Sequence, residues 1–303
     1  MKIAIVGSGM VGATTAYALL HRGLAREIVL CDADRARAEG EAMDLSHASP
    51  FLKYARVVER PLERVEEADL VVIAAGRGSL PGETRLDQLA ENAKRVRSIC
   101  AVIRRFTRLP IVLVVSNPVD VLAQIAAREL GDAARVFGSG TTLDTARLKT
   151  ALGARFGLDP HSIHGYVLGE HGDSEFAAWS TVAAGGVGVR DWPGYDAAEL
   201  ERIFTGVRRA AYEIVKRKRA TYYAIGAAAA LIAEAVLRDQ GSVLPVSVAL
   251  DGQYGLRGLS LSLPCVLGRD GVRRVLTPRL DEGELALLSR SASVLAGALA
   301  RSS

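Results

Sequence analysis

The sequence predicts an α/β fold built on a doubly wound parallel sheet, and three features support this prediction. Short, almost wholly apolar runs recur through residues 1–140, as strands buried on both faces require. Segments of helical composition separate these runs, and a glycine-rich turn follows the first of them. Such sheets bind ligands at the carboxyl ends of their strands, so we expect functional residues at that edge.

Composition limits the class of protein. A chain of 303 residues can form one large domain or two of ordinary size, and 49% hydrophobic with 24% charged residues is typical of a soluble globular protein. The three cysteines are odd in number and far apart, which favours a reduced, cytoplasmic chain over a disulfide framework or a metal site. We expect no signal peptide and no membrane partner, because the chain starts on a strand and its apolar runs are short.

The charge balance favours small anions as partners. The net charge is +4, from 38 Lys and Arg against 34 Asp and Glu, with a local basic run at residues 216–219. Only 5% of residues are aromatic and no nucleic-acid-binding motif accompanies the basic run, so we expect no nucleic acid partner. We interpret the basic surface as a field that attracts anionic small molecules.

The first element is a strand over residues 3–6. It leads into GSGMVG at residues 7–12, and residues 13–20 have helical composition. A second apolar strand over residues 27–31 ends in Asp32. A strand before the glycines, a helix after them and an acid about 20 residues further on are the context that a Rossmann-type dinucleotide site requires.

Each residue of this motif has a physical task. Gly7 allows the tight turn, Gly9 lets a pyrophosphate approach the backbone, and Gly12 lets helix and strand pack closely. Free N–H groups at the helix N-terminus attract the phosphates. Asp32 would bind the ribose hydroxyls and repel a 2′-phosphate, which favours NAD over NADP. The alternative is a glycine-rich turn that binds no ligand.

Further strands and helices complete the first half. We expect strands at residues 69–75, 110–115 and 135–138, and helices at residues 91–106 and 119–130. Asn117 directly follows one of these strands, so its side chain is predicted to face a ligand, although Asn-Pro is also ordinary turn chemistry.

The second half has an α+β pattern. The Gly, Ser and Thr residues near position 140 indicate a hinge, so we predict a dinucleotide-binding domain at residues 1–140 and a substrate domain at residues 141–303. We expect strands at residues 162–168, 243–250 and 259–267, and helices at residues 197–219, 222–238 and 281–299.

A histidine loop after the first of these strands is the candidate catalytic element. His171 has carboxylates nearby at Glu170 and Asp173, and imidazole is the side chain best suited to exchange protons near neutral pH. A solvated surface histidine is the alternative. Asp144 and Arg147 are three residues apart on a predicted helix, where they could form an ordinary ion pair. The functional interpretation separates them: Arg147 binds a substrate carboxylate, and Asp144 faces the histidine.

A glycine-containing loop at residues 76–85 is the candidate lid. It ends in Arg85, and its composition suits a segment that closes over substrate. The alternative is a mobile surface loop in which Arg85 interacts with acidic neighbours of the next helix.

These motifs together resemble the L-lactate dehydrogenases of the lactate/malate dehydrogenase family over nearly the whole chain. The motifs that carry the resemblance are GSGMVG at 7–12, PGETRLD at 81–87, SNPVD at 116–120, GSGTTLDTARL at 138–148, YVLGEHGDSE at 166–175, ATYYAIG at 220–226 and SLSLP at 260–264. The resemblance implies NAD-dependent interconversion of pyruvate and L-lactate in the cytoplasm by a homotetramer.

The resemblance also implies roles for single residues. His171 corresponds to the proton donor and acceptor, Asp144 to its carboxylate partner, and Arg85 to the arginine that polarises the carbonyl. Arg147, Asn117, Thr221 and Ser79 correspond to substrate-binding positions. The expected cofactor contacts are Gly7, Gly9, Met10, Val11, Gly12, Asp32, Ala75, Gly76, Ser116, Asn117 and Ser139.

Two departures from the family pattern leave alternatives open. Lactate dehydrogenases carry Gln, and malate dehydrogenases Arg, where this chain has Ser79, so a malate dehydrogenase or a broader 2-oxo acid reductase remains an alternative. An allosteric fructose 1,6-bisphosphate site would use Lys149 and His164, where the family pattern has Arg and His. Two other classes are an NAD-binding protein without turnover and an assembly module that binds a partner through residues 216–219.

Overall fold

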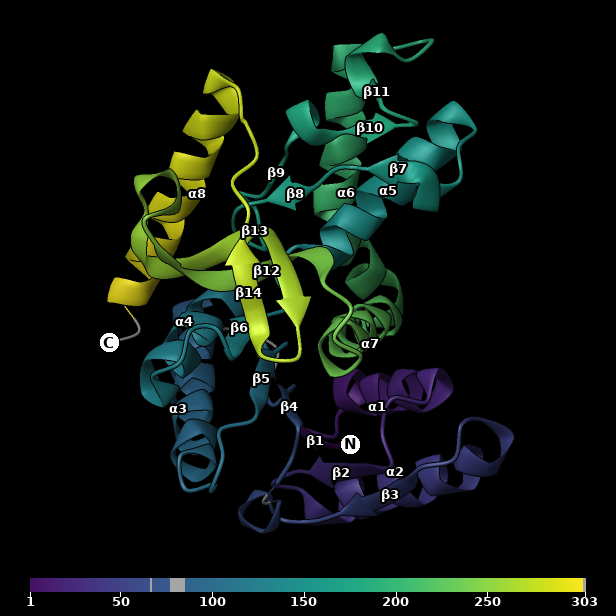
Figure 1. The fold of residues 1–303 in the computed structure, drawn as a ribbon, viewed down its shortest axis with the longest axis vertical. Coiled ribbons are helices and arrows are strands. Elements are labelled where there is room, and N and C mark those ends of the chain that lie inside the picture. The colour runs from purple at the N-terminus through teal and green to yellow at the C-terminus, as the bar shows by residue number, and fades with distance from the viewer. Residues whose placement is uncertain (66, 77–84, 302–303) are drawn as a thin grey trace.

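The computed structural model in Figure 1 describes residues 1–65, 67–76 and 85–301. Side chains are described for these ranges apart from residues 85–87. The predicted lid therefore lies almost entirely outside the described residues, as does Ser79.

One nine-stranded sheet runs through the molecule. Its parallel part has the order β3-β2-β1-β4-β5-β6, which is the doubly wound order of dinucleotide-binding folds. Antiparallel strands β12, β13 and β14 continue the sheet beyond β6, so it crosses the predicted hinge near residue 140. The strands are β1 (Lys2–Val6), β2 (Glu27–Cys31), β3 (Arg56–Glu59), β4 (Leu70–Ile73), β5 (Ile111–Val114), β6 (Val136–Gly138), β12 (Ser242–Asp251), β13 (Arg257–Gly268) and β14 (Gly271–Val275).

Helices cover both faces of this sheet, which confirms the predicted α/β class (Figure 1). Helix α1 (Met10–Arg22) packs against α7 (Tyr223–Leu237), while α3 (Arg85–Ile103) packs against α4 (Val119–Leu130). These two pairs lie on opposite sides of the central strands (Figure 1). Helix α2 (Arg35–Ala48) packs on β2 and β3, and α8 (Glu282–Ala300) packs on β13.

The histidine loop belongs to a smaller region with its own core. Helices α5 (Thr142–Phe156) and α6 (Ala197–Lys218) pack together there. The single strand predicted at residues 162–168 is wrong: it is divided into β7 (Ile163–His164) and β8 (Val167–Leu168). The reason is Gly165, whose φ of +139° interrupts extended backbone. The other strands are β9 (Phe176–Ala177), β10 (Ala183–Ala184) and β11 (Val187–Gly188). Short 3₁₀ helices occupy Ser49–Phe51, Leu62–Arg64, Pro160–Ser162, Trp179–Thr181, Val189–Asp191 and Gln253–Gly255.

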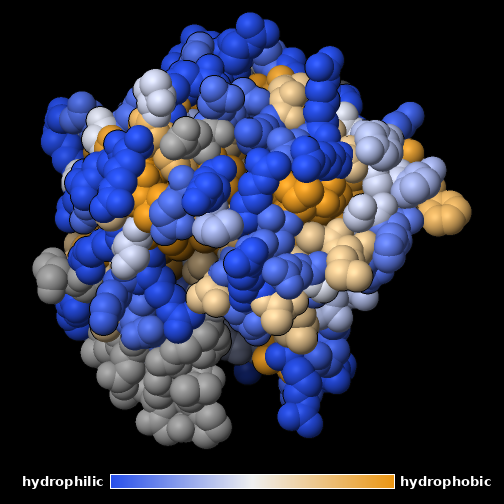
Figure 2. Space-filling view, turned by 90° about the horizontal axis from the view of Figure 1, so that it is seen from below, coloured by the Kyte–Doolittle hydropathy of each residue, from blue (hydrophilic) through white to orange (hydrophobic). Residues whose placement is uncertain are grey.

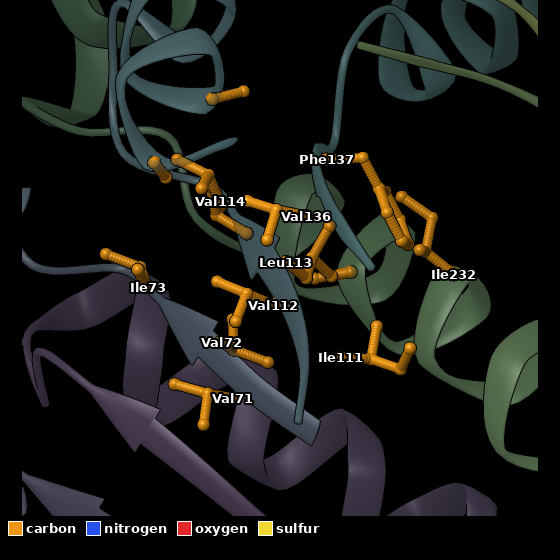
Figure 3. Close-up of a cluster of buried hydrophobic side chains, with 14 of the residues drawn as sticks. Val71, Val72, Ile73, Ile111, Val112, Leu113, Val114, Val136, Phe137 and Ile232 are labelled. Carbon is orange, nitrogen blue, oxygen red and sulfur yellow. The ribbon is translucent and has the colours of Figure 1, made fainter. Parts of the chain in front are cut away.

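The main core lies between the sheet and its helices. Figure 3 shows Phe137 of β6 next to Ile232 of α7, with Leu113 of β5 and Val72 of β4 on the adjacent strands. All four side chains are fully buried. Burying a side chain of this size contributes about 1.5–3 kcal/mol. This packing makes the sheet a rigid base for the residues at its edge.

The surface is largely polar. In Figure 2, hydrophilic residues cover most of one face, and hydrophobic residues are visible in separate clusters between them. All three cysteines are free and buried. No helix in the described part of the chain has the length and apolar character needed to span a membrane.

Candidate active site

The glycine turn after β1 has the shape of a phosphate cradle. Gly7 has φ +100°, and a Cβ there would lie 2.5 Å from the backbone N of Ala75. A Cβ on Gly12 would lie 1.9 Å from the carbonyl oxygen of Gly7, so only glycine permits this close packing. A Cβ on Gly9 would meet no described atom within 4 Å, which leaves open space in front of the N-terminus of α1. A pyrophosphate fits this arrangement, because the open space at Gly9 would let it approach the N-terminus of α1.

Asp32 closes the turn at the end of β2. Its carboxylate accepts hydrogen bonds from the backbone N of Ser8 at 2.6 Å, the Ser8 hydroxyl at 3.0 Å and the Arg37 guanidinium at 2.8 Å. Burial alone would raise the pKa of Asp32, but these hydrogen bonds and one from the backbone N–H of Asp34 lower it. The side chain is therefore a fixed anion, as a ribose-binding group that disfavours a 2′-phosphate must be.

The other expected cofactor positions meet at the carboxyl ends of β4, β5 and β6. The Ser116 hydroxyl donates to the carbonyl of Ala75 at 2.6 Å, and the backbone N–H of Ser139 donates to the carbonyl of Val114 at 2.8 Å. Gly76 lies beside Ser116 and Asn92. Among the expected positions on α1, Met10 is 61% exposed and Val11 is half-buried.

Asn117 lies at the same edge with an exposed side chain. Its backbone carbonyl accepts a hydrogen bond of 2.9 Å from the Asn92 side chain. Asn92, on α3, is a positioning residue that the sequence did not reveal, because an Asn inside a helix resembles an ordinary surface residue.

Asp144 and His171 form the central pair of the second half. Nδ1 of His171 lies 2.6 Å from one oxygen of Asp144, and the other oxygen accepts a hydrogen bond of 2.8 Å from Arg147. The expectation that Arg147 and Asp144 separate is wrong for this structure. A carboxylate has two oxygens, so one Asp144 serves both partners. The Arg147 side chain is 14% exposed, and that of Asp144 2%.

Asp120 connects this pair to the cofactor edge. It lies in the first turn of α4, three residues after Asn117, and its carboxylate accepts the backbone N–H of His171 at 2.8 Å. The histidine is thereby held next to the carboxyl end of β5. A second link is the pair of backbone hydrogen bonds between Gly169 and Ser262 of β13, at 2.9 and 3.1 Å. Asp120 was not predicted either, since an acid at a helix N-terminus needs no functional explanation.

The electrostatics of the pair favour a protonated histidine. Burial lowers the pKa of His171, but attraction to Asp144 and the hydrogen bond to it outweigh burial and, with Glu175 and Asp120, raise the pKa to about 9. Burial also opposes ionisation of Asp144, yet His171 and Arg147 lower its pKa. The pair is thus an imidazolium and a carboxylate at neutral pH.

Glu175 is a further carboxyl group beside this pair, and its role could not be predicted from the sequence. Its side chain is 4% exposed, and its Oε1 has no hydrogen-bond partner among the described residues. Burial and the Asp144 charge raise the pKa of Glu175 to about 9. The only sequence signal was an acid directly before the apolar strand β9.

Ligand atoms of Asp144, His171 and Glu175 lie within 4.8 Å of one another, so a metal site must be considered. Two ligands on one tetrahedral zinc ion are about 3.4 Å apart, given bonds of about 2.1 Å. The His171–Asp144 separation of 2.6 Å is that of a hydrogen bond, and Arg147 adds a cation to the same carboxylate. The geometry favours proton chemistry over metal binding.

The remaining predicted positions are less defined. The side chains of Arg85 and Ser79 lie outside the described part of the structure, although the backbone of Arg85 begins α3. Thr221 is half-buried in the connection between α6 and α7. Lys149 is half-buried on α5 and His164 is exposed on β7, and these two elements contact each other.

Comparisons with known proteins agree with this geometry. Residues 1–138 match the family described as the lactate/malate dehydrogenase NAD binding domain, and residues 141–302 match the lactate/malate dehydrogenase alpha/beta C-terminal domain. The chain belongs to the lactate/malate dehydrogenase family. This membership makes it an oxidoreductase of dehydrogenase type whose first half is the family's NAD-binding domain.

Members of this family similar to the chain include L-lactate dehydrogenases from several bacteria. The protein from a Synechococcus strain is 46% identical over 297 residues, covering 97% of each chain. The protein from Kosmotoga olearia is 44% identical over 308 residues, covering 99% of this chain and 95% of the other. A crystal structure of the minor L-lactate dehydrogenase from Enterococcus mundtii superposes with a TM-score of 0.96 at 39% identity, covering 99% of this chain and 97% of that one.

Proposed function

We propose that this family member is an NAD-dependent L-lactate dehydrogenase that interconverts pyruvate and L-lactate. The observation that carries the proposal is the His171–Asp144 pair of 2.6 Å, held by Asp120 beside the carboxyl end of β5. A proton-exchanging group at the edge where a dinucleotide is expected to bind is what reduction of a 2-oxo acid needs.

The hydrogen bond between His171 and Asp144 decides which ring nitrogen can exchange a proton with substrate. Nδ1 of His171 donates to Asp144, so Nε2 is the nitrogen that can exchange a proton with substrate. In pyruvate reduction the imidazolium donates its Nε2 proton to the carbonyl oxygen, which otherwise would become an alkoxide. Asp144 stabilises the imidazolium and fixes the orientation of the ring. A bound NADH supplies the hydride.

The two arginines complete the proposed substrate site. Arg147 would bind the substrate carboxylate through an edge of its guanidinium that Asp144 does not use, because planar two-pronged contact suits a carboxylate. Arg85 would polarise the carbonyl when the loop before α3 closes. Asn117, Thr221 and Ser79 would surround the substrate. The glycine turn, Asp32 and the strand-end residues described above would hold NAD.

Finer parts of the proposal concern assembly, location and organisation. We infer a homotetramer in the cytoplasm, supported by family similarity and by the three free, buried cysteines. We keep the domain division at residue 140, near the junction of the two family matches. Lys149 and His164, on contacting elements, are the proposed fructose 1,6-bisphosphate ligands, and burial lowers the pKa of Lys149, which an anion would offset.

A substrate panel tests the proposal. With NADH, we expect kcat/KM for pyruvate to exceed that for oxaloacetate, because Ser79 supplies no cation for a second carboxylate. We expect weak discrimination among monocarboxylates, with 2-oxoisocaproate also accepted, because Ser79 is smaller than the Gln of lactate dehydrogenases. The same assay with fructose 1,6-bisphosphate tests the allosteric part. A hundredfold preference for oxaloacetate would make the chain a malate dehydrogenase, and no NADH oxidation with any 2-oxo acid would leave only cofactor binding.

A further inference from the structure

Glu175 is a buried carboxyl group that the proton step above does not use. It directly precedes β9, and its side chain is 4% exposed. A carboxylate oxygen of Glu175 lies in the same cluster as Nδ1 of His171 and an oxygen of Asp144, all within 4.8 Å. Its Oε1 is buried without a hydrogen-bond partner among the described residues, which is costly for a group with no function.

The charges that face this cluster come from several elements. Helix α5 contributes Asp144 and Arg147, which both act on Glu175. Helix α6 contributes Arg208, which also attracts Glu175. Glu175 and Arg208 both line a cavity of about 380 Å³. Glu201 of α6 and Glu284 of α8 also line this cavity.

The histidine has one more acidic neighbour on its backbone side. Helix α4 contributes Asp120, which binds the backbone N–H of His171, and burial raises the pKa of Asp120 to about 6. Glu170, next in sequence to His171, disfavours ionisation of Asp120. Among the described residues, four carboxyl groups therefore lie near His171, and Arg147 and Arg208 are the other cations that act on Glu175.

We propose that Glu175 is a positioning residue that sets the proton affinity of the His171–Asp144 pair. The inference deepens the proposed function and rests on it, because the His171 proton is the one transferred to pyruvate. Glu175 and His171 both have a pKa of about 9, so Glu175 becomes charged in the pH range in which His171 loses its proton. There the ionised form of Glu175 stabilises the imidazolium, and the imidazolium in turn favours the ionised form of Glu175. A change in the charge of one group therefore favours an opposite change in the charge of the other, so the buried site avoids a large net charge.

The test uses two substitutions that remove this charge from the full chain. Glu175→Gln keeps the shape of the side chain, and Glu175→Met replaces it with an apolar group of similar volume, so a folded variant remains if the buried amide is not tolerated. Glu201→Gln is the matched control, because it removes a different carboxylate that also lines this cavity. Glu175→Asp retains the charge.

The readout is the titration of the His171 ring by NMR in protein labelled with ¹⁵N-histidine, without cofactor. The chain has five histidines, and the signal missing in His171→Asn identifies the residue. We expect the midpoint to fall by about one pH unit in both Glu175→Gln and Glu175→Met, by less in Glu175→Asp, and by under about 0.2 unit in Glu201→Gln. An unchanged midpoint in both charge-removing variants overturns the inference.

A kinetic measurement separates this inference from the proposed function. Pyruvate reduction requires protonated His171, so the alkaline limb of kcat/KM against pH should move to lower pH by the same amount as the NMR midpoint. If the midpoint moves but no variant, nor the parent, reduces pyruvate, the inference about Glu175 stands and the proposed reaction fails. If the parent reduces pyruvate and neither measurement shifts, the reaction stands and the role of Glu175 is refuted.

Discussion

The two halves of the proposed site are built from different materials. The cofactor half is mainly backbone: glycines at 7, 9 and 12 shape the turn, and the carboxylate of Asp32 closes it. The proton-exchanging half consists of buried ionisable groups: His171, Asp144 and Glu175 lie within one small cluster. Shape determines the first half and electrostatic balance the second. Mutations should therefore damage the two halves separately.

His171→Ala should produce the largest effect and confine it to one half. The variant lacks the proposed proton donor, so turnover of pyruvate should fall about a thousandfold, while NADH affinity stays within about twofold. Steady-state kinetics and fluorescence titration with NADH measure the two quantities. His161→Ala is the control, because the His161 side chain is 95% exposed and pairs with nearby Asp159. Retention of more than a tenth of the activity in His171→Ala contradicts the assigned role.

Gly9→Ala should instead damage the cofactor half, by weakening NADH binding while the fold is retained. The backbone at Gly9 is extended with φ −71°, and its Cβ would enter open space, so the fold should tolerate the methyl group. A pyrophosphate in that space would meet the methyl group, and NADH affinity should fall about tenfold or more. Isothermal titration calorimetry measures the affinity.

Gly12→Ala is the matched comparison for this position. Its Cβ would lie 1.9 Å from the Gly7 carbonyl, so the free energy of unfolding should fall by about 2 kcal/mol or more. Denaturant unfolding distinguishes the two variants. If Gly9→Ala binds NADH as well as the parent, the cradle lies elsewhere.

The same contrast explains what sequence could predict. The glycine turn is contiguous, and its strand, turn and helix follow one another, so a local pattern was sufficient to place Gly7, Gly9, Gly12 and Asp32. Five of the six parallel strands followed from apolar runs in the same way, whereas β3 was not predicted because charged residues stand at both of its ends. The smaller strands β9, β10 and β11 were missed because two-residue strands carry no periodicity.

The buried charges were harder to predict because they converge from distant segments. Asp144 and His171 were paired by family resemblance, and their contact follows from neither spacing nor composition. Asp120 and Glu175 became visible only when α4 and the residues before β9 were placed against the histidine loop. Burial makes each of these acids important, and burial of a single acid cannot be derived from a local pattern.

The smallest expected effect is the pH dependence of stability, and it comes from the charged half. The pKa of His171 rises from 6.5 in the unfolded chain to about 9 in the fold, so between these values the folded protein binds more protons. Its contribution is fully present below pH 6.5 and is lost as pH rises through 9. Glu175, whose pKa rises from 4.5 to about 9, changes stability in the same direction in this window.

The parent should therefore lose more stability than His171→Asn between pH 6.5 and 9. A pKa shift from 6.5 to about 9 would correspond to about 3 kcal/mol of unfolding free energy. The His171 side chain is 23% exposed and its titration is coupled to that of Glu175, so we expect the parent to lose about 1 kcal/mol more than the variant. Urea unfolding at both pH values without cofactor measures it, with His161→Asn as the exposed-histidine control. Equal losses in the parent and in His171→Asn would mean that the imidazolium contributes no net stability, and the proton-exchanging half would then be held by its backbone contacts to Asp120 and Ser262.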